Sequence, residues 1–115
     1  MFYNRIKQNA WRLSDLSYRP DTECLTRDGQ EIALSRLNHR LLMALVTHAP
    51  AILRVEDIVP LVWGDTQVSA ETVKQRVRLL RQALGDDAEQ PKYIEAVRGR
   101  GYRWCTEVAS HTFAR

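Results

Sequence analysis

Basic side chains gather between residues 69 and 104, with the spacing of a helix followed by a hairpin. Eight basic and five acidic residues fall in this segment, so it carries the chain's whole excess of three positive charges. The basic residues are Lys74, Arg76, Arg78, Arg81, Lys92, Arg98, Arg100 and Arg103. Such a concentration favours a polyanionic partner. A solvated charged face would explain the same asymmetry, so charge alone leaves both interpretations open.

A capped amphipathic helix is predicted over residues 70–84. Ser69 is suited to the N-cap and Gly85 to the residue after the last turn. The apolar positions, which share one narrow arc of the helix, are Val73, Val77, Leu80 and Leu84. The opposite face holds Glu71, Gln75, Arg78 and Gln82. Arginine, glutamine and threonine on an exposed helix face suit base edges and phosphates.

A hairpin is predicted after this helix, with strands over 93–97 and 102–104. The turn between them is Arg98-Gly99-Arg100-Gly101. Glycines let the backbone turn sharply, and arginines at such a tip can enter a narrow groove of enhanced negative potential. The helix and the hairpin together favour DNA binding.

The elements that must position this segment are strands and two further helices. Trp11 and Leu13 alternate with polar residues, and the Asp28-Gly29 pair between two alternating runs predicts a hairpin. Helices are predicted over 36–48, with Ser35 as the N-cap, and over 55–62, where Pro60 should kink or shorten the helix. The fold class is therefore α+β, with an N-terminal antiparallel sheet, three helices and a C-terminal β-hairpin.

Composition bounds the function classes. The chain has 115 residues, 44% of them hydrophobic and 27% charged, as expected for one globular domain. Its longest apolar run, 41–46, is far too short to span a bilayer. The two cysteines, Cys24 and Cys105, are expected to be reduced thiols, although a bridge between them is the alternative. No metal-ligand pattern, phosphate loop or nucleophile-base set occurs, so neither an enzyme nor a cofactor is expected.

The residues resemble the winged helix-turn-helix DNA-binding domain of the OmpR/PhoB type. The resemblance is carried by Val62-Trp63-Gly64, by Thr72-Val73 through Leu80-Arg81-Gln82-Ala83-Leu84, and by Pro91 to Arg103 with its Arg98-Gly99-Arg100-Gly101-Tyr102 sequence. The wing is also similar to that of ToxR/CadC-like regulators. The resemblance implies a winged-helix domain over 9–104, with an N-terminal extension over 1–8. A polar, frayed tail is expected over 105–115.

The resemblance also implies roles for individual residues. Helix 70–84 would read the major groove and wing 98–101 the minor groove. The residues that would face the major groove are Thr72, Gln75, Arg76, Arg78 and Leu79. The phosphate-contacting candidates are Trp63, Lys74, Arg81, Tyr102 and Arg103, with Arg76 and Arg78 aligned to phosphate positions as well. Arg98 and Arg100 are the minor-groove candidates.

Three features depart from the usual response-regulator pattern. Leu79 stands where many response regulators have an arginine, and it could pack on a thymine methyl instead. Glu71 stands where a basic residue is common. Neither a receiver domain nor a membrane span accompanies the motif, so we expect a stand-alone cytoplasmic regulator or the N-terminal part of a longer protein.

The expected partner is duplex DNA, bound singly or as head-to-tail pairs on direct repeats, with RNA polymerase as a further candidate partner. Trp63 is either a core residue or a phosphate contact. The alternative function is a winged helix that docks on protein without binding DNA, which Leu79 on the exposed face favours.

Overall fold

The computed structural model describes residues 9–112, which divide into two compact units. One unit comprises residues 9–33 and 107–112, and the other is Leu34–Thr106. The expected N-terminal extension at 1–8 and the last three residues of the expected tail lie outside the described residues. The two cysteines, both free thiols, belong to different units.

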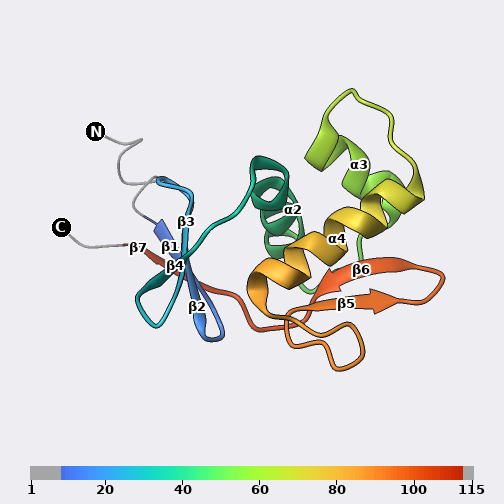
Figure 1. Cartoon of the computed structure of the whole chain (residues 1–115). Coiled ribbons are helices and arrows are strands. Elements are labelled where there is room, and N and C mark those ends of the chain that lie inside the picture. The colour runs from blue at the N-terminus through green and yellow to red at the C-terminus, as the bar shows by residue number, and fades with distance from the viewer. Residues whose placement is uncertain (1–8, 113–115) are drawn as a thin grey trace. The chain divides into compact units, whose positions relative to one another are not determined.

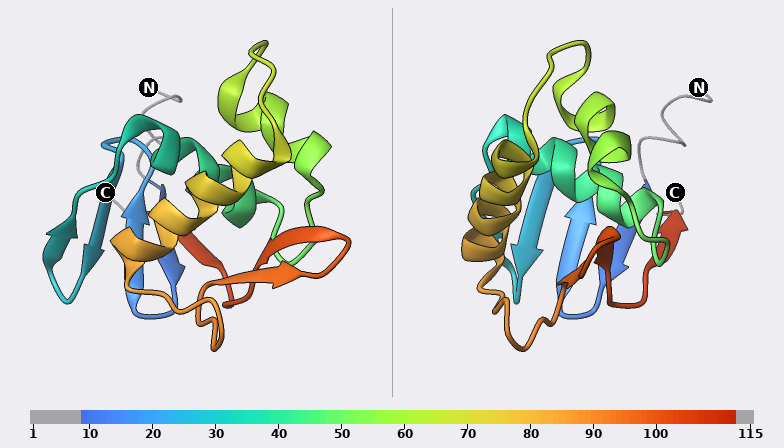
Figure 2. Two further views of the ribbon diagram at one scale, coloured as in Figure 1. Left: turned by 45° about the vertical axis from the view of Figure 1, so that its right-hand side comes forward. Right: turned by 90° about the vertical axis from the view of Figure 1, so that its right-hand side faces the viewer.

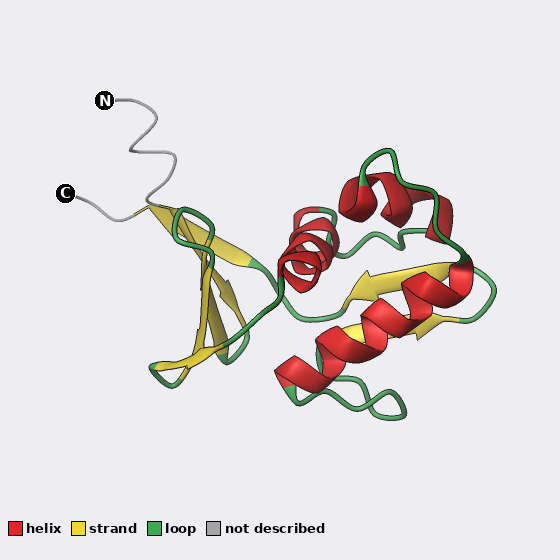
Figure 3. Ribbon diagram, turned by 45° about the horizontal axis from the view of Figure 1, so that its top comes forward, coloured by secondary structure: helices red, strands yellow, loops and turns green. Residues whose placement is uncertain are grey.

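The first unit is a five-stranded antiparallel sheet with the strand order β4-β3-β2-β1-β7. Figure 3 draws the strands in yellow. Its strands are β1 (Asn9–Leu13), β2 (Leu16–Arg19), β3 (Cys24–Arg27), β4 (Gln30–Ile32) and β7 (Ala109–Thr112). The predicted hairpin is confirmed. Arg27 pairs with Gln30, and Asp28 and Gly29 between them have φ of +52° and +79°, the backbone that a two-residue hairpin turn requires.

Strand β7 was not predicted. The expectation of a frayed tail is wrong for residues 109–112, which pair with β1 in the register Asn9↔Thr112 to Arg12↔Ala109. The pairing is made by backbone groups along the free edge of β1, so it leaves no alternating apolar signal in the polar sequence Ala-Ser-His-Thr.

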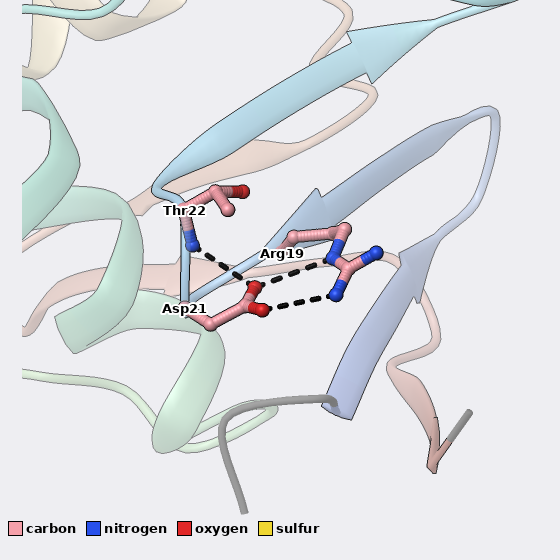
Figure 4. A network of polar contacts seen from close by, with 3 residues as sticks. All are labelled: Arg19, Asp21 and Thr22. Carbon is pink, nitrogen blue, oxygen red and sulfur yellow. Dashed lines mark hydrogen bonds and ion pairs between the residues drawn. The ribbon is translucent and has the colours of Figure 1, made fainter. Parts of the chain in front are cut away.

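An ion pair closes the turn from β2 to β3 (Figure 4). The Arg19 guanidinium contacts both oxygens of Asp21, at 2.9 and 3.2 Å, and the backbone N–H of Thr22 donates to the same carboxylate at 2.9 Å. The hydrogen bond from Arg19 is the main reason that the pKa of Asp21 is lowered. A charge-assisted fork of this kind fixes a short connection between strands.

The second unit contains the three helices and the hairpin (Figures 1 and 2). The helices are α2 (Arg36–Thr47), α3 (Val55–Trp63) and α4 (Ala70–Leu84), followed by β5 (Ile94–Val97) and β6 (Gly101–Trp104). α2 packs against α3, α4 and β6. Ser35 caps α2 by accepting a hydrogen bond from the backbone N–H of Asn38 at 3.1 Å, as predicted.

Helix α3 continues through Pro60, so of the two expected effects the shortening does not occur. The helix runs on to Trp63, one residue beyond the predicted end. Gly64 then ends it with φ of +64°. Proline removes only one intrahelical donor, and the burial of Ile58 and Val62 against the neighbouring helices offsets that loss.

Helix α4 and the hairpin follow their predictions closely. Ser69 accepts from the N–H of Thr72, and Gly85 is left-handed with φ of +72°. The four predicted core residues of α4 are all buried. In the hairpin, Trp104 is buried and stacks on Tyr93 with ring centroids 5.6 Å apart. Strand β6 begins one residue earlier than predicted, because Gly101 pairs with Val97.

Candidate nucleic-acid interface

The outer face of α4 presents polar and basic side chains along three turns. Thr72, Lys74, Gln75 and Arg78 are exposed, and Leu79 is half-buried beside them. The Thr72 and Ser69 hydroxyls lie 3.1 Å apart, so Thr72 belongs to the first turn's cap. The sequence predicted this exposed face, because side chains outside the buried arc of a helix point away from the core.

Two of these side chains are linked to each other. Nε of Arg78 donates to Oε1 of Gln75 at 3.1 Å, across one turn of the exposed surface. Within the described part of the chain, the two terminal nitrogens of Arg78 keep their donors available, and so does the amide nitrogen of Gln75. An arginine and a glutamine are the side chains that read guanine and adenine in the major groove.

Arg76 lies at the border of this face and turns toward α2. Its Nη1 donates to Oδ1 of Asn38 at 3.3 Å. Its Nε is buried and has no hydrogen-bond partner within the part of the chain that the structure describes. The structure therefore places Arg76 partly inside the helical packing, which its position on the helical wheel did not indicate.

Arg81 also turns inward, toward the hairpin. Its Nη2 donates to the carbonyl oxygen of Ile94 at 3.0 Å, so it connects α4 to β5. Its Nε, like that of Arg76, is buried without a partner among residues 9–112. Burial raises the pKa of Tyr102, and the positive charge of Arg81 partly opposes that shift.

The tip of the hairpin carries two exposed arginines, Arg98 and Arg100. Between them Gly99 has φ of +75°, and the N–H of Arg100 donates to the carbonyl of Val97 at 2.9 Å, which closes a tight turn. Neither guanidinium has an ion-pair partner in the described part of the chain. Their full positive charge therefore faces solvent.

An open groove of about 530 Å³ separates the hairpin tip from the start of α3. Arg98 and Arg100 line one side and Arg54 the other. Arg54 is already paired, with Glu56 and with Asp57, both at 3.3 Å. The hydrogen bond from Arg54 is also the main reason that the pKa of Asp57 is lowered. The uncompensated charge of the groove is therefore on its hairpin side.

The other predicted DNA contacts, Arg103, Trp63 and Tyr102, are either paired with an acidic residue or partly buried. Nε of Arg103 lies 2.6 Å from Oε1 of Glu95 on the neighbouring strand, so its charge is already compensated. Trp63 is half-buried at the end of α3, intermediate between the two roles considered for it. Tyr102 is half-buried in β6. These three side chains therefore do not belong to the set of exposed, unpaired cations.

Three residues that support the site went unnoticed in the sequence. Asn38 is a buried polar residue, 7% exposed. Nη1 of Arg40 donates to the carbonyl of Val62 at 3.3 Å and so satisfies the last turn of α3. Asp86 accepts backbone N–H donors from Lys92, Tyr93 and Ile94. Of these three, only Asp86 could have been recognised from the sequence. An aspartate after a helix-ending glycine commonly accepts hydrogen bonds from nearby backbone N–H groups.

Gly101 fixes the hairpin to the connection that precedes α3. The backbone of Leu53 exchanges two hydrogen bonds with Tyr102, of 2.8 and 2.9 Å. A Cβ added at Gly101 would lie 2.0 Å from the Leu53 carbonyl oxygen. Glycine at this position is therefore required by close approach of two backbones.

Among residues 9–112, no three or more His, Cys, Asp or Glu side chains come together in a way that could hold a metal ion. Nor does any helix there have the length and apolar character needed to cross a membrane.

Comparison with known proteins identifies the family of this arrangement. Residues 29–104 match the family described as "Transcriptional regulatory protein, C terminal". Over 99 residues the chain is 32% identical to a probable transcriptional regulatory protein of Picosynechococcus, covering 85% of this chain and 39% of the relative. The chain thus spans about two fifths of that curated relative's length.

Solved structures with the same fold include two DNA-binding domains. The RstA domain of Klebsiella pneumoniae, crystallised with the RstA box, has a TM-score of 0.77 and 27% identity, covering 83% of this chain and 95% of that one. The CadC domain of E. coli has a TM-score of 0.79 and 25% identity, covering 91% and 99%. The expected winged-helix fold is confirmed.

Proposed function

The chain belongs to the family "Transcriptional regulatory protein, C terminal", and from that premise we propose that it regulates transcription by binding duplex DNA at specific sequences. Helix α4 enters the major groove, and the turn at 98–101 enters the adjacent minor groove. The observation that carries the proposal is the set of exposed cations on these two elements that have no acidic partner among residues 9–112, namely Lys74, Arg78, Arg98 and Arg100.

The exposed residues of α4 divide by chemistry. Arg78 suits the two acceptors of guanine and Gln75 the donor and acceptor of adenine. Thr72 can bond to either kind of base, and Leu79 can pack on a thymine methyl. Lys74 neutralises a phosphate. Phosphate contacts from Arg76, Arg81, Trp63, Tyr102 and Arg103 surround this set.

The hairpin supplies the second contact. Arg98 and Arg100 are exposed on a tight turn and enter the minor groove, where negative potential is strongest in A·T-rich sequence. Similarity to an RstA domain that was solved with its DNA box supports this arrangement.

We extend the proposal to the location, the assembly and the partners of the chain. In this proposal the chain acts in a bacterial cytoplasm and catalyses no reaction. Two copies bind direct repeats head to tail, and the bound pair contacts RNA polymerase. The domain that binds DNA occupies residues 9–104.

Selection of bound duplexes from a random pool tests DNA binding and yields the site. Affinity for the selected duplex is then measured against salt concentration. A domain that neutralises about five phosphates should give a log-log slope of about −4 to −5. Arg78→Gln should weaken binding, whereas the matched change Arg12→Gln, at an exposed position of the sheet unit, should not. A flat salt response, or no duplex recovered, would reject DNA binding and favour docking on protein.

A further inference from the structure

The buried polar residue Asn38 lies directly behind the proposed DNA-binding face of α4. It lies on α2 with 7% of its surface exposed. Side-chain amides are mostly exposed, and those that are buried are nearly always hydrogen-bonded. Its Oδ1 accepts a hydrogen bond from Nη1 of Arg76 at 3.3 Å. Because a guanidinium can only donate, the oxygen of this amide is the atom that must face it.

This contact restricts what Arg76 can reach. Nη1 has one of its two hydrogens directed to Asn38, and Nε is buried and therefore inaccessible to a partner on DNA. Side-on recognition of guanine through Nε and Nη2 is excluded in this conformation. The donors that remain are one hydrogen of Nη1 and the two of Nη2. Phosphate oxygens, the most frequent acceptors of protein hydrogen bonds on DNA, suit these donors.

The hydrogen-bond partner of Arg76 is a neutral amide and not a carboxylate, and this difference decides whether the charge of Arg76 is compensated. A carboxylate in place of the amide would compensate the charge of Arg76, as Glu95 does for Arg103. A neutral amide orients the guanidinium and leaves its positive charge for an outside anion. Within the described residues no ion pair involves Arg76.

We propose that Asn38 is a positioning residue that directs Arg76 to a DNA phosphate while leaving its charge uncompensated. The inference rests on the proposed DNA-binding function. It assigns Arg76 to the phosphate frame and leaves base reading to Thr72, Gln75, Arg78 and Leu79.

The test uses the full chain and two probes, a labelled duplex of mixed sequence and the duplex obtained by selection. Affinity, salt slope and urea unfolding are measured for Asn38→Asp, Asn38→Leu and Arg76→Ala. Arg76→Ala should weaken binding to both duplexes by about 10-fold and make the salt slope shallower by about 1. Asn38→Asp should also make the slope shallower by about 1 while folding stability is retained, because the new carboxylate pairs with Arg76.

Asn38→Leu keeps the branched shape and the number of heavy atoms of the side chain and removes the acceptor. It should weaken binding several-fold on both duplexes, and it should add no further loss in the Arg76→Ala background. A merely structural role for Asn38 predicts instead that affinity follows stability in every variant.

Three results would overturn the inference: a wild-type salt slope for Asn38→Asp, additive losses in the double variant, or a loss for Arg76→Ala that is confined to the selected duplex. Failure of the wild-type chain to bind either duplex at low salt would instead reject the proposed function itself.

Discussion

Nη2 of Arg81 lies 3.0 Å from the carbonyl oxygen of Ile94, so the proposed recognition helix α4 is hydrogen-bonded to the first strand of the wing. The bond connects the two elements that must enter adjacent grooves of one duplex. Arg81 thus has a structural partner in addition to the phosphate contact expected for it. We therefore expect this side chain to help hold the helix and the wing in their relative orientation.

Arg81→Ala should loosen the wing. Removal of the guanidinium leaves the Ile94 carbonyl without this donor, which should cost about 1–3 kcal/mol of folding stability. Backbone amides of β5 and β6 should then exchange faster with deuterium, and DNA affinity should fall on all sequences alike. Arg78→Ala, an exposed change on the same helix, is the control and should leave wing exchange unchanged. Equal exchange in both variants would contradict the linking role.

The sequence predicted the elements of the interface because each has local signals. Ser69, Gly85 and the four-residue apolar arc define α4 without reference to the rest of the chain. Asp28-Gly29 does the same for the hairpin of the sheet unit. Turn and cap chemistry depends on near neighbours, so one sequence suffices for it.

The contacts behind the interface were not predictable in the same way. Arg76 meets Asn38 from 38 positions away, and Arg81 meets a backbone carbonyl of the wing. A helical wheel places both arginines beside the exposed arc, but their long side chains can turn either outward or inward. Strand β7 was missed for a related reason, since its pairing depends on a strand about 100 residues earlier.

Arg98→Ala should weaken binding most on duplexes with A·T-rich flanks. Its guanidinium is exposed at the tip of the wing, and a narrow minor groove has the strongest negative potential. Lys74→Ala should weaken binding on every sequence alike and make the salt slope shallower by about 1. Fluorescence anisotropy on paired duplexes that differ only in their flanks measures both. A loss for Arg98→Ala that ignores flank composition would remove the wing from the minor groove.

Alkaline pH should destabilise the sheet unit through Tyr18. Burial, assisted by the negative charge of Glu23, raises the pKa of this phenol from 10.0 to about 12. Because the folded state favours the protonated form, the associated stability is fully present below pH 10.0 and is lost as pH rises toward about 12. Urea midpoints measured across this range should fall for the wild type and change less for Tyr18→Phe. Parallel pH profiles would show that Tyr18 is not the group responsible.

Asp86→Ala should detach the loop that connects α4 to β5. The Asp86 carboxylate accepts the N–H groups of Lys92 at 2.7 Å and Ile94 at 2.8 Å, and it also receives that of Tyr93. Loss of these charge-assisted bonds should lower the free energy of unfolding by about 2–3 kcal/mol. The neighbouring Asp87 accepts only the N–H of Glu89 among the bonds described, so Asp87→Ala is the matched control and should cost far less. Similar urea midpoints for the two variants would refute the anchoring role.

Gly101→Ala should displace the wing from the connection before α3. A methyl group there would lie 2.0 Å from the Leu53 carbonyl oxygen and 2.7 Å from its carbon, and backbone atoms cannot move aside as a flexible side chain can. We expect a loss of about 3 kcal/mol or more in unfolding free energy. Gly99→Ala separates collision from backbone strain, because Gly99 also has positive φ but its added methyl meets nothing within 4 Å.

Gly99→Ala should therefore cost only about 1–2 kcal/mol, the usual penalty of a left-handed residue with a side chain. DNA binding adds a second comparison between the two glycines. Gly101→Ala should abolish the preference for A·T-rich flanks, since Arg98 and Arg100 extend from a turn that is no longer fixed to Leu53. Equal stability losses at the two glycines would show that the close approach of β6 to Leu53 does not hold the wing in place.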